Sequence, residues 1–199
     1  MGSALPAEQP LPDIATAESW LAEQGVEGQL LAHVRLVAAI AEHLAGRLAN
    51  AGESVDPVLA QRGGLLHDLA KLSAKKVARS HELMAAEILL GKGQPELAEI
   101  ARRHAMWAPL TEGQRPETRE QKLVYYADRI AEHDRLVGID ARMLEIAGRR
   151  PELRARIEQY RAAALAQEAE IAAALGVSVP ELWREIERGT TSPTGASEG

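Results

Sequence analysis

The chain has 199 residues, no cysteine and a formal net charge of −6, from 23 basic and 29 acidic side chains. This length fits one domain with its own core. The lack of cysteine excludes disulfides, thiolate zinc sites and cysteine nucleophiles, so a metal ion would need His, Asp or Glu ligands. The acidic balance argues against a general binder of nucleic acid and favours a small or nucleotide-sized ligand.

The sequence also lacks the usual signals for a membrane or for export. It has no run of about 18 uncharged apolar residues. The first residues, MGSALPAEQPLPD, have neither the basic region nor the apolar stretch of a secretory signal. We therefore expect a soluble, cytoplasmic protein without a membrane partner.

The composition predicts an all-α fold, because helix-favouring residues dominate and no stretch alternates as a strand does. Residues 1–15 are rich in proline and small residues, and we expect them to form a flexible arm. Residues 189–199 have the composition of a disordered tail. Thr16 is expected to cap a short helix that ends at Gly25.

A long helix is predicted next, from about Gly28 to Asn50, because its apolar residues recur at steps of three and four. The following helix, over residues 57–72, comes after an aspartate cap, begins with proline and carries His67 and Asp68 near its end. The remaining predicted helices cover residues 80–91, 94–107, 119–136, 139–148, 151–176 and 178–189. The loops at 50–56 and 109–118 are expected to form the rim of a site.

Three features of the polar residues suggest chemistry. His33 lies on the apolar stripe of the long helix, so it should point inward. His67 directly precedes Asp68, about 100° away around a helix, and Asp128 lies on an otherwise apolar helix face. Buried carboxylates are costly unless paired or metal-bound, and divalent ions accept imidazole and carboxylate together. The pair is therefore either a hydrogen-bonded polar pair at a helix end or part of a metal site. His43 and His133 are expected to be surface or structural residues.

The order of one histidine, a His-Asp pair and a distant aspartate resembles the HD-domain superfamily of metal-dependent phosphohydrolases. The resemblance covers roughly residues 31–136 and implies an all-α helical bundle. It also implies that His33, His67, Asp68 and Asp128 hold a metal ion. In the same terms, residues 16–138 would be the metal-binding core and 139–188 would be C-terminal helices packed on it.

Two further histidines extend the resemblance. His81 and His104 fall between the His-Asp pair and Asp128, as in the branch that binds two metals with the pattern H…HD…H…H…D. In that branch Asp68 would bridge the two ions. The runs HDLAK and KLVYYAD are similar to those of YqeK-type symmetrical diadenosine tetraphosphate hydrolases. The ligands suit two divalent ions, iron or manganese first and cobalt or nickel next.

The resemblance implies a hydrolase for a nucleotide or another small phosphorylated metabolite. Two ions about 3.5–4 Å apart would activate a water for attack on phosphorus. Asp68 and Lys71 are the predicted catalytic residues, because Lys71 lies one turn after the pair and can stabilise charge on the phosphate. Lys71, Arg103 and Arg129 are the predicted substrate-binding residues.

Several alternatives remain open on the sequence alone. Lys71 could be an ordinary exposed lysine, and His81 and His104 could simply occupy helix termini. The same ligands could serve a mixed-valent di-iron oxygenase, or the fold could be a non-catalytic ligand sensor. The charged helix at 151–176 could cover the site or form a contact in a homodimer.

Overall fold

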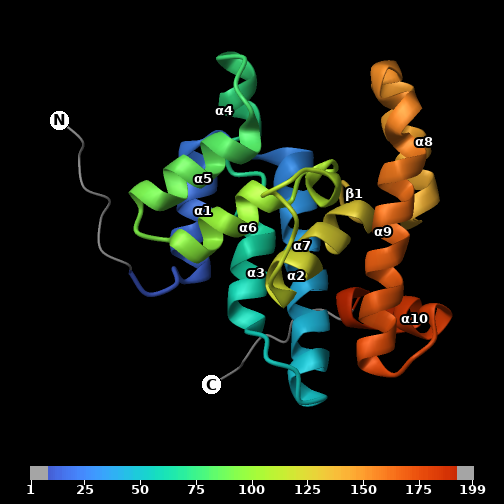
Figure 1. The fold of residues 1–199 in the computed structure, drawn as a ribbon. Coiled ribbons are helices and arrows are strands. Elements are labelled where there is room, and N and C mark those ends of the chain that lie inside the picture. The colour runs from blue at the N-terminus through green and yellow to red at the C-terminus, as the bar shows by residue number, and fades with distance from the viewer. Residues whose placement is uncertain (1–8, 192–199) are drawn as a thin grey trace.

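The computed structural model describes residues 9–191. Within them the protein is helical apart from one short hairpin, which confirms the all-α prediction (Figure 1). The elements are, in chain order, α1 (Ile14–Glu23), α2 (Gly28–Asn50), α3 (Pro57–Leu66), α4 (Lys71–Lys76), α5 (His81–Gly91), α6 (Pro95–Arg103), the 3-10 turn η1 (Ala108–Leu110), α7 (Arg119–Ile130), β1 (Ala131–Glu132), β2 (Arg135–Leu136), α8 (Gly138–Arg149), η2 (Pro151–Leu153), α9 (Arg154–Leu175) and α10 (Val179–Thr191).

The helix starts follow local capping signals. The Asp56 carboxylate accepts hydrogen bonds from two backbone N–H groups at the start of α3, and the Ser80 hydroxyl accepts one at the start of α5. The predicted Thr16 cap is wrong. Asp13 caps α1 instead, accepting a hydrogen bond of 2.7 Å from the Thr16 backbone N–H. A carboxylate before the first turn satisfies a free N–H there, so the helix begins within the segment expected to be an arm.

The predicted helix over residues 57–72 is interrupted, which is a second correction. The α3 helix ends at Leu66, a turn follows over residues 67–70, and α4 begins at Lys71. Within the turn, the Lys71 N–H donates to the Asp68 carbonyl at 3.0 Å. His67 and Asp68 therefore lie outside a regular helix, and their side chains are not bound to its angular spacing.

The predicted helix over residues 119–136 is also too long. The α7 helix ends at Ile130, and the chain reverses through the β1–β2 hairpin, with Ala131 opposite Leu136. His133 sits in the turn with a φ of 54°, a left-handed conformation that histidine tolerates better than most side chains. The Val137 N–H then donates to the Ile130 carbonyl at 2.9 Å. This reversal sends α8 back toward the core.

The α2 helix is the central rod, and it packs against α3 and α7 (Figure 1). Its apolar stripe is buried, as the periodicity predicted. The closest approach is at Gly64 of α3, where a Cβ atom would lie 2.7 Å from the Ala38 Cα and 2.8 Å from its backbone nitrogen. Only glycine lets α2 and α3 come this near, because the obstacle is backbone that cannot turn aside.

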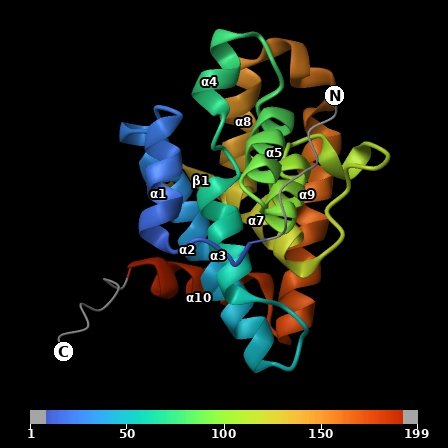
Figure 2. The same ribbon diagram turned by 90° about the vertical axis from the view of Figure 1, so that its left-hand side faces the viewer.

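The last three helices pack against this bundle through α7 and α2 (Figure 2). Glu168 of α9 is buried, and one of its carboxylate oxygens accepts hydrogen bonds from the Tyr126 hydroxyl at 2.9 Å and the Trp183 indole at 2.8 Å. Burial and the nearby Glu168 charge raise the pKa of Tyr126, so the phenol stays a neutral donor. This three-residue junction ties α7, α9 and α10 together.

Two regions expected to be irregular lie mostly outside the described residues, namely positions 1–8 of the arm and 192–199 of the tail. Residues 189–191, also assigned to the tail, instead continue α10. No single helix within residues 9–191 has the length and apolar character needed to cross a membrane. The pair Pro151–Leu175 and Val179–Thr190 meets that test only jointly, across an 84° bend.

We expect Gly64→Ala to lower the free energy of unfolding by about 1–3 kcal/mol, because overpacking must push α2 and α3 apart. Urea unfolding followed by circular dichroism measures this difference. Gly46→Ala in α2 is the matched control, since its Cβ would meet nothing within 4 Å. It should be neutral or stabilising by about 0.5–1 kcal/mol. Equal effects of both substitutions would contradict the close-packing argument.

Candidate metal centre

Two helix ends supply the most deeply buried histidines of the site. His67 follows α3, and its Nδ1 lies 2.7 Å from the Gly64 carbonyl; His104 follows α6, and its Nδ1 lies 2.6 Å from the Ala101 carbonyl. The last carbonyls of a helix have no partner within the helix, so a ring N–H at this position satisfies one of them. In a neutral imidazole this bond fixes the proton on Nδ1 and leaves Nε2 with a free lone pair.

The Asp68 carboxylate lies between two groups of imidazole nitrogens. Its Oδ2 is 3.4 Å from His67 Nε2 and 3.9 Å from His33 Nε2. Its Oδ1 is 3.2 Å from His81 Nε2 and 3.5 Å from His104 Nε2. Each oxygen therefore faces its own pair of rings.

Asp128 completes the first group from α7. Its Oδ1 lies 3.1 Å from His33 Nε2 and 3.8 Å from His67 Nε2. Its other oxygen is in close contact with Arg129. The structure thus brings together His33, His67, Asp68, His81, His104 and Asp128, which are the six residues that the sequence pattern singled out.

Burial sets the charge state of these groups. It lowers the pKa of His33 to about 2, with a further contribution from His67, and the pKa of His104 to about 4. Both rings are therefore neutral near pH 7. Burial alone would raise the pKa of Asp68, but the Lys71 ammonium and then the neighbouring His67 hold it well below its ordinary value, so this side chain is an anion.

The arrangement leaves electron pairs facing one another. His67 Nε2 and Asp68 Oδ1 are buried and have no hydrogen-bond partner. The His104 Nε2, whose ring proton is used at Nδ1, lies 3.2 Å from His81 Nε2. Buried acceptors that converge without a donor are unfavourable, and a cation between them removes the penalty. The donor set of imidazole nitrogens and carboxylate oxygens fits a divalent ion of the first transition row.

The predicted substrate-binding residues have different surroundings. Lys71 Nζ donates to Asp68 Oδ2 at 2.5 Å, and its side chain is 43% exposed. Arg129 is buried beside Asp128, and its Nη2 donates to the His104 carbonyl at 3.4 Å. Burial lowers the pKa of Arg129 to about 10, which leaves it cationic at neutral pH. Both residues line the cavity above the six ligand candidates.

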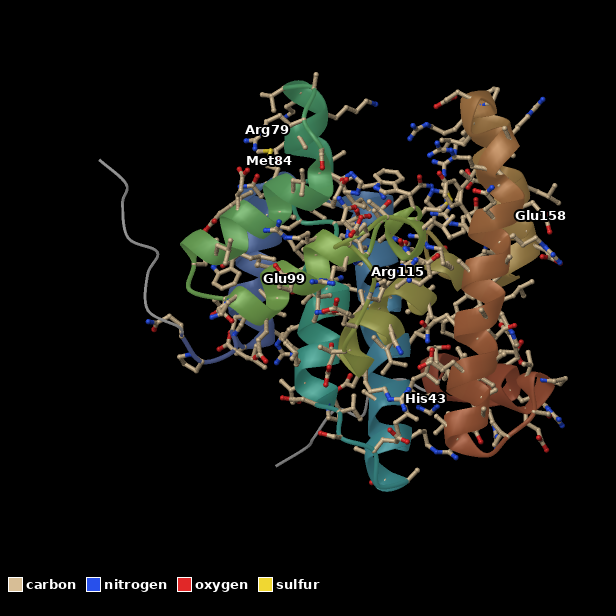
Figure 3. The ribbon with its side chains drawn as sticks, in the orientation of Figure 1. His43, Arg79, Met84, Glu99, Arg115 and Glu158 are labelled. Carbon is tan, nitrogen blue, oxygen red and sulfur yellow. The ribbon has the colours of Figure 1, made fainter. Side chains whose placement is uncertain are left out.

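Arg103 is not brought to the site. Its guanidinium bonds the Glu99 carboxylate at 3.0 Å and the Arg115 carbonyl at 2.6 Å, on the face where Figure 3 labels Glu99 and Arg115. His43 is remote as well. It lies on α2 beside α10 (Figure 3), so close that a Cβ at Gly189 would meet its ring at 2.4 Å. His133 is exposed in the hairpin turn at the cavity edge.

A cavity of about 600 Å³ opens above the six side chains, a size that suits a small ligand. Its walls come from α2, α4, α5, α7 and α8, from residues 104–107 after α6 and from the hairpin turn, and not from the loops at 50–56 and 109–118. Those loops instead contribute to another cavity of about 560 Å³, at Ser54, Val55, Asp56 and Thr118. The two loops that were expected to form the rim of the site therefore border a different cavity.

Sequence reasoning missed several residues near the site. Glu82 is buried, and its Oε2 lies 3.3 Å from His81 Nδ1, where it can orient the ring. Lys75 of α4, Arg142 and Arg149 of α8, and Arg150 directly after α8 also line the cavity. The spacing of Arg142 and Arg149, seven residues apart on one helix face, was the available signal.

The profile of the HD domain matches residues 30–132, slightly more than half of the chain, and this span includes all six ligand candidates. The chain belongs to the HD domain family. The family is one of metal-dependent phosphohydrolases, and the His and Asp clusters of this HD domain could hold metal ions.

A curated relative gives a partial match. Ribonuclease Y of Acidothermus cellulolyticus is 39% identical over 89 residues, which is 45% of this chain and 17% of that protein. The HD protein described here thus matches less than a fifth of the ribonuclease. No solved structure gives a significant match.

We expect Mn²⁺ at about a hundred times its dissociation constant to raise the melting temperature of the wild-type protein by roughly 5–10 °C, because it binds only the folded donors. Asp68→Asn should abolish this increase. Without metal the variant should melt no lower than the metal-free wild type, because the amide can donate to an imidazole nitrogen that faces an anion in the wild type.

Differential scanning calorimetry with chelator and with Mn²⁺ measures both effects. Asp134→Asn, an exposed carboxylate in the hairpin turn, is the control and should respond to Mn²⁺ as the wild type does. A metal-free Asp68→Asn protein that melts far below the wild type would mean that the carboxylate stabilises the fold without an ion.

Proposed function

We propose that the protein is a hydrolase with two metal ions that cleaves a phosphoester or phosphoanhydride bond of a nucleotide or another small phosphorylated metabolite. The observation that carries the proposal is the Asp68 carboxylate, whose two oxygens face separate pairs of histidines. A carboxylate in this position could act as a ligand shared by two metal ions. The proposal includes the six-ligand branch of the family and its similarity to the YqeK-type hydrolases.

The residues divide into two groups around that bridge. His33, His67 and Asp128 would hold one ion, and His81 and His104 the other, with iron or manganese preferred. Two such ions would lower the pKa of a shared water and hold a phosphate oxygen. His67 and His104 each hydrogen-bond a backbone carbonyl through Nδ1, which keeps their Nε2 atoms directed into the site. Glu82 orients the His81 ring in the same way.

Two cationic side chains would serve the phosphate. Lys71 is tethered to Asp68 but partly exposed to the cavity, so its ammonium group can move onto a phosphate oxygen and stabilise developing negative charge. Arg129 contacts the Asp128 carboxylate and presents its guanidinium to the same cavity. In this proposal residues 16–138 form the metal-binding core, and residues 139–188 pack on it.

The partial match to a ribonuclease supports a second candidate, the hydrolysis of a phosphodiester bond in RNA. The same metal centre would serve both reactions, so the two differ only in what surrounds the phosphorus. The net charge of −6 and the size of the cavity favour the small substrate.

We expect the protein, purified without chelator, to contain close to two transition-metal ions per chain. A His81→Ala/His104→Ala double variant should retain one, because only the second group loses its nitrogens. Elemental analysis by mass spectrometry measures the content. A His43→Ala variant controls for histidine loss elsewhere and should keep both ions. Equal metal content in the double variant and the wild type would overturn the two-ion assignment.

We expect hydrolysis of nucleotides or dinucleoside polyphosphates to require a divalent ion and to proceed with manganese in the absence of air. His67→Ala and Asp68→Ala should each reduce kcat/KM by about 100-fold or more. Each substitution removes a ligand candidate for the ions that would stabilise negative charge on the reacting phosphate. Phosphate release and chromatographic product analysis measure the rates. Activity only with reduced iron and oxygen would replace the hydrolase by an oxygenase, and cleavage of oligoribonucleotides alone would favour the ribonuclease.

A further inference from the structure

The cavity above the metal centre is cationic although the chain as a whole is acidic. Six lysine and arginine side chains line it against three carboxylates, and two of those carboxylates, Asp68 and Asp128, are ligand candidates. Glu145 is the remaining acid in the lining. One phosphate group carries too little negative charge to neutralise these lysine and arginine side chains together with divalent ions.

Much of this charge comes from α8, which lies outside the residues matched by the HD domain profile. Arg142, Glu145, Ile146 and Arg149 recur at steps of three and four, so they share the helix face that lines the cavity, and Arg150 follows directly. Across the cavity stand Lys71 and Lys75 of α4. Figure 1 shows α4 and α8 as separate helices at the top of the molecule.

Arg142 is the least exposed of the three arginines that residues 142–150 contribute to the cavity. Its side chain is only 13% exposed, and its Nε is buried without a hydrogen-bond partner. A buried guanidinium with an unused donor is costly, and an anion in the cavity would satisfy it.

Glu145 occupies the place of such an anion. Its carboxylate accepts a hydrogen bond of 2.8 Å from Arg142 Nη1 and another of 2.8 Å from Arg149 Nη2. The carboxylate thus holds the two arginines side by side at the cavity wall. The same guanidinium groups can turn to phosphate oxygens, which accept forked hydrogen bonds in the same way.

We propose that this face of α8 is a phosphate-binding subsite, and that the substrate is a nucleotide with a chain of phosphates running from the metal centre toward Arg142, Arg149 and Arg150. The proposal rests on the proposed function, because it places the reacting phosphate at the ions. A phosphate chain with four or more negative charges matches the positive wall, whereas a monoester reaches only the centre. The enclosed volume of about 600 Å³ suits such a molecule better than a strand of RNA.

The test compares the binding of inorganic tripolyphosphate and orthophosphate by titration calorimetry, with Mn²⁺ in constant excess for every protein. Arg149→Ala/Arg150→Ala removes two exposed cations of the wall, so its effect on folding should be small. The preference is the ratio of the dissociation constants of orthophosphate and tripolyphosphate. It should fall by about tenfold in this variant, because a tenfold change in affinity corresponds to the loss of about one hydrogen bond to a charged group. Glu145→Gln should change the preference in the opposite direction, because it removes the competing anion.

Arg156→Ala is the matched control, since Arg156 is exposed on α9 and does not line the cavity. A preference that falls equally in this control and in the double variant would overturn the subsite. So would tripolyphosphate binding that is unchanged in the double variant while binding of a single-stranded oligoribonucleotide weakens. A loss of preference without hydrolysis of any phosphate compound would support the subsite and overturn only the proposed function.

Discussion

The burial of one carboxylate, Asp68, is the constraint on which the rest of the site depends. A buried anion is unfavourable unless positive charge or hydrogen-bond donors lie beside it. Lys71 supplies a positive charge to one of the two Asp68 oxygens. The imidazoles around it cannot donate where their protons are committed to the Gly64 and Ala101 carbonyls. The fold therefore brings nitrogen and oxygen lone pairs close together. Their mutual repulsion is unfavourable without an ion, and a bound cation would remove it. The turn after α3, which frees Asp68 from helical geometry, makes the bridging position accessible.

The scaffold serves this centre through one close contact between helices. Gly64 lets α3 approach the backbone of α2, and its carbonyl also orients the His67 ring. The same residue thus determines the distance between the helices that carry His33 and His67 and the direction of one ligand nitrogen. Packing and chemistry are coupled here, because a change in the helix separation would move His33 relative to His67 and Asp68.

Local signals predicted much of the fold, and long-range contacts account for the two predicted helices that were too long. The helix at Gly28–Asn50 was predictable because its apolar stripe and its ends lie in one segment. The interruption at His67 and the hairpin at His133 were not, because both segments have good helix-forming residues and turn for reasons of tertiary packing. The six ligand candidates converge as their pattern indicated. The wall at Arg142 and Arg149 was missed because chain reversal at the hairpin, invisible in the sequence, brings α8 over the site.

The order of the ligand candidates along the chain has a consequence for biosynthesis. His33 and Asp128 are 95 residues apart and meet only when α7 docks on α2, so the centre closes late among the contacts of the core. Yet all six side chains precede α8, α9 and α10, which are held to α7 in part through Glu168. On a ribosome the half with the six ligand candidates emerges before α8, the helix whose side chains line the cavity. Under the proposed function, ions would therefore reach the centre while it is still open to solvent, and α8 would then limit their exchange.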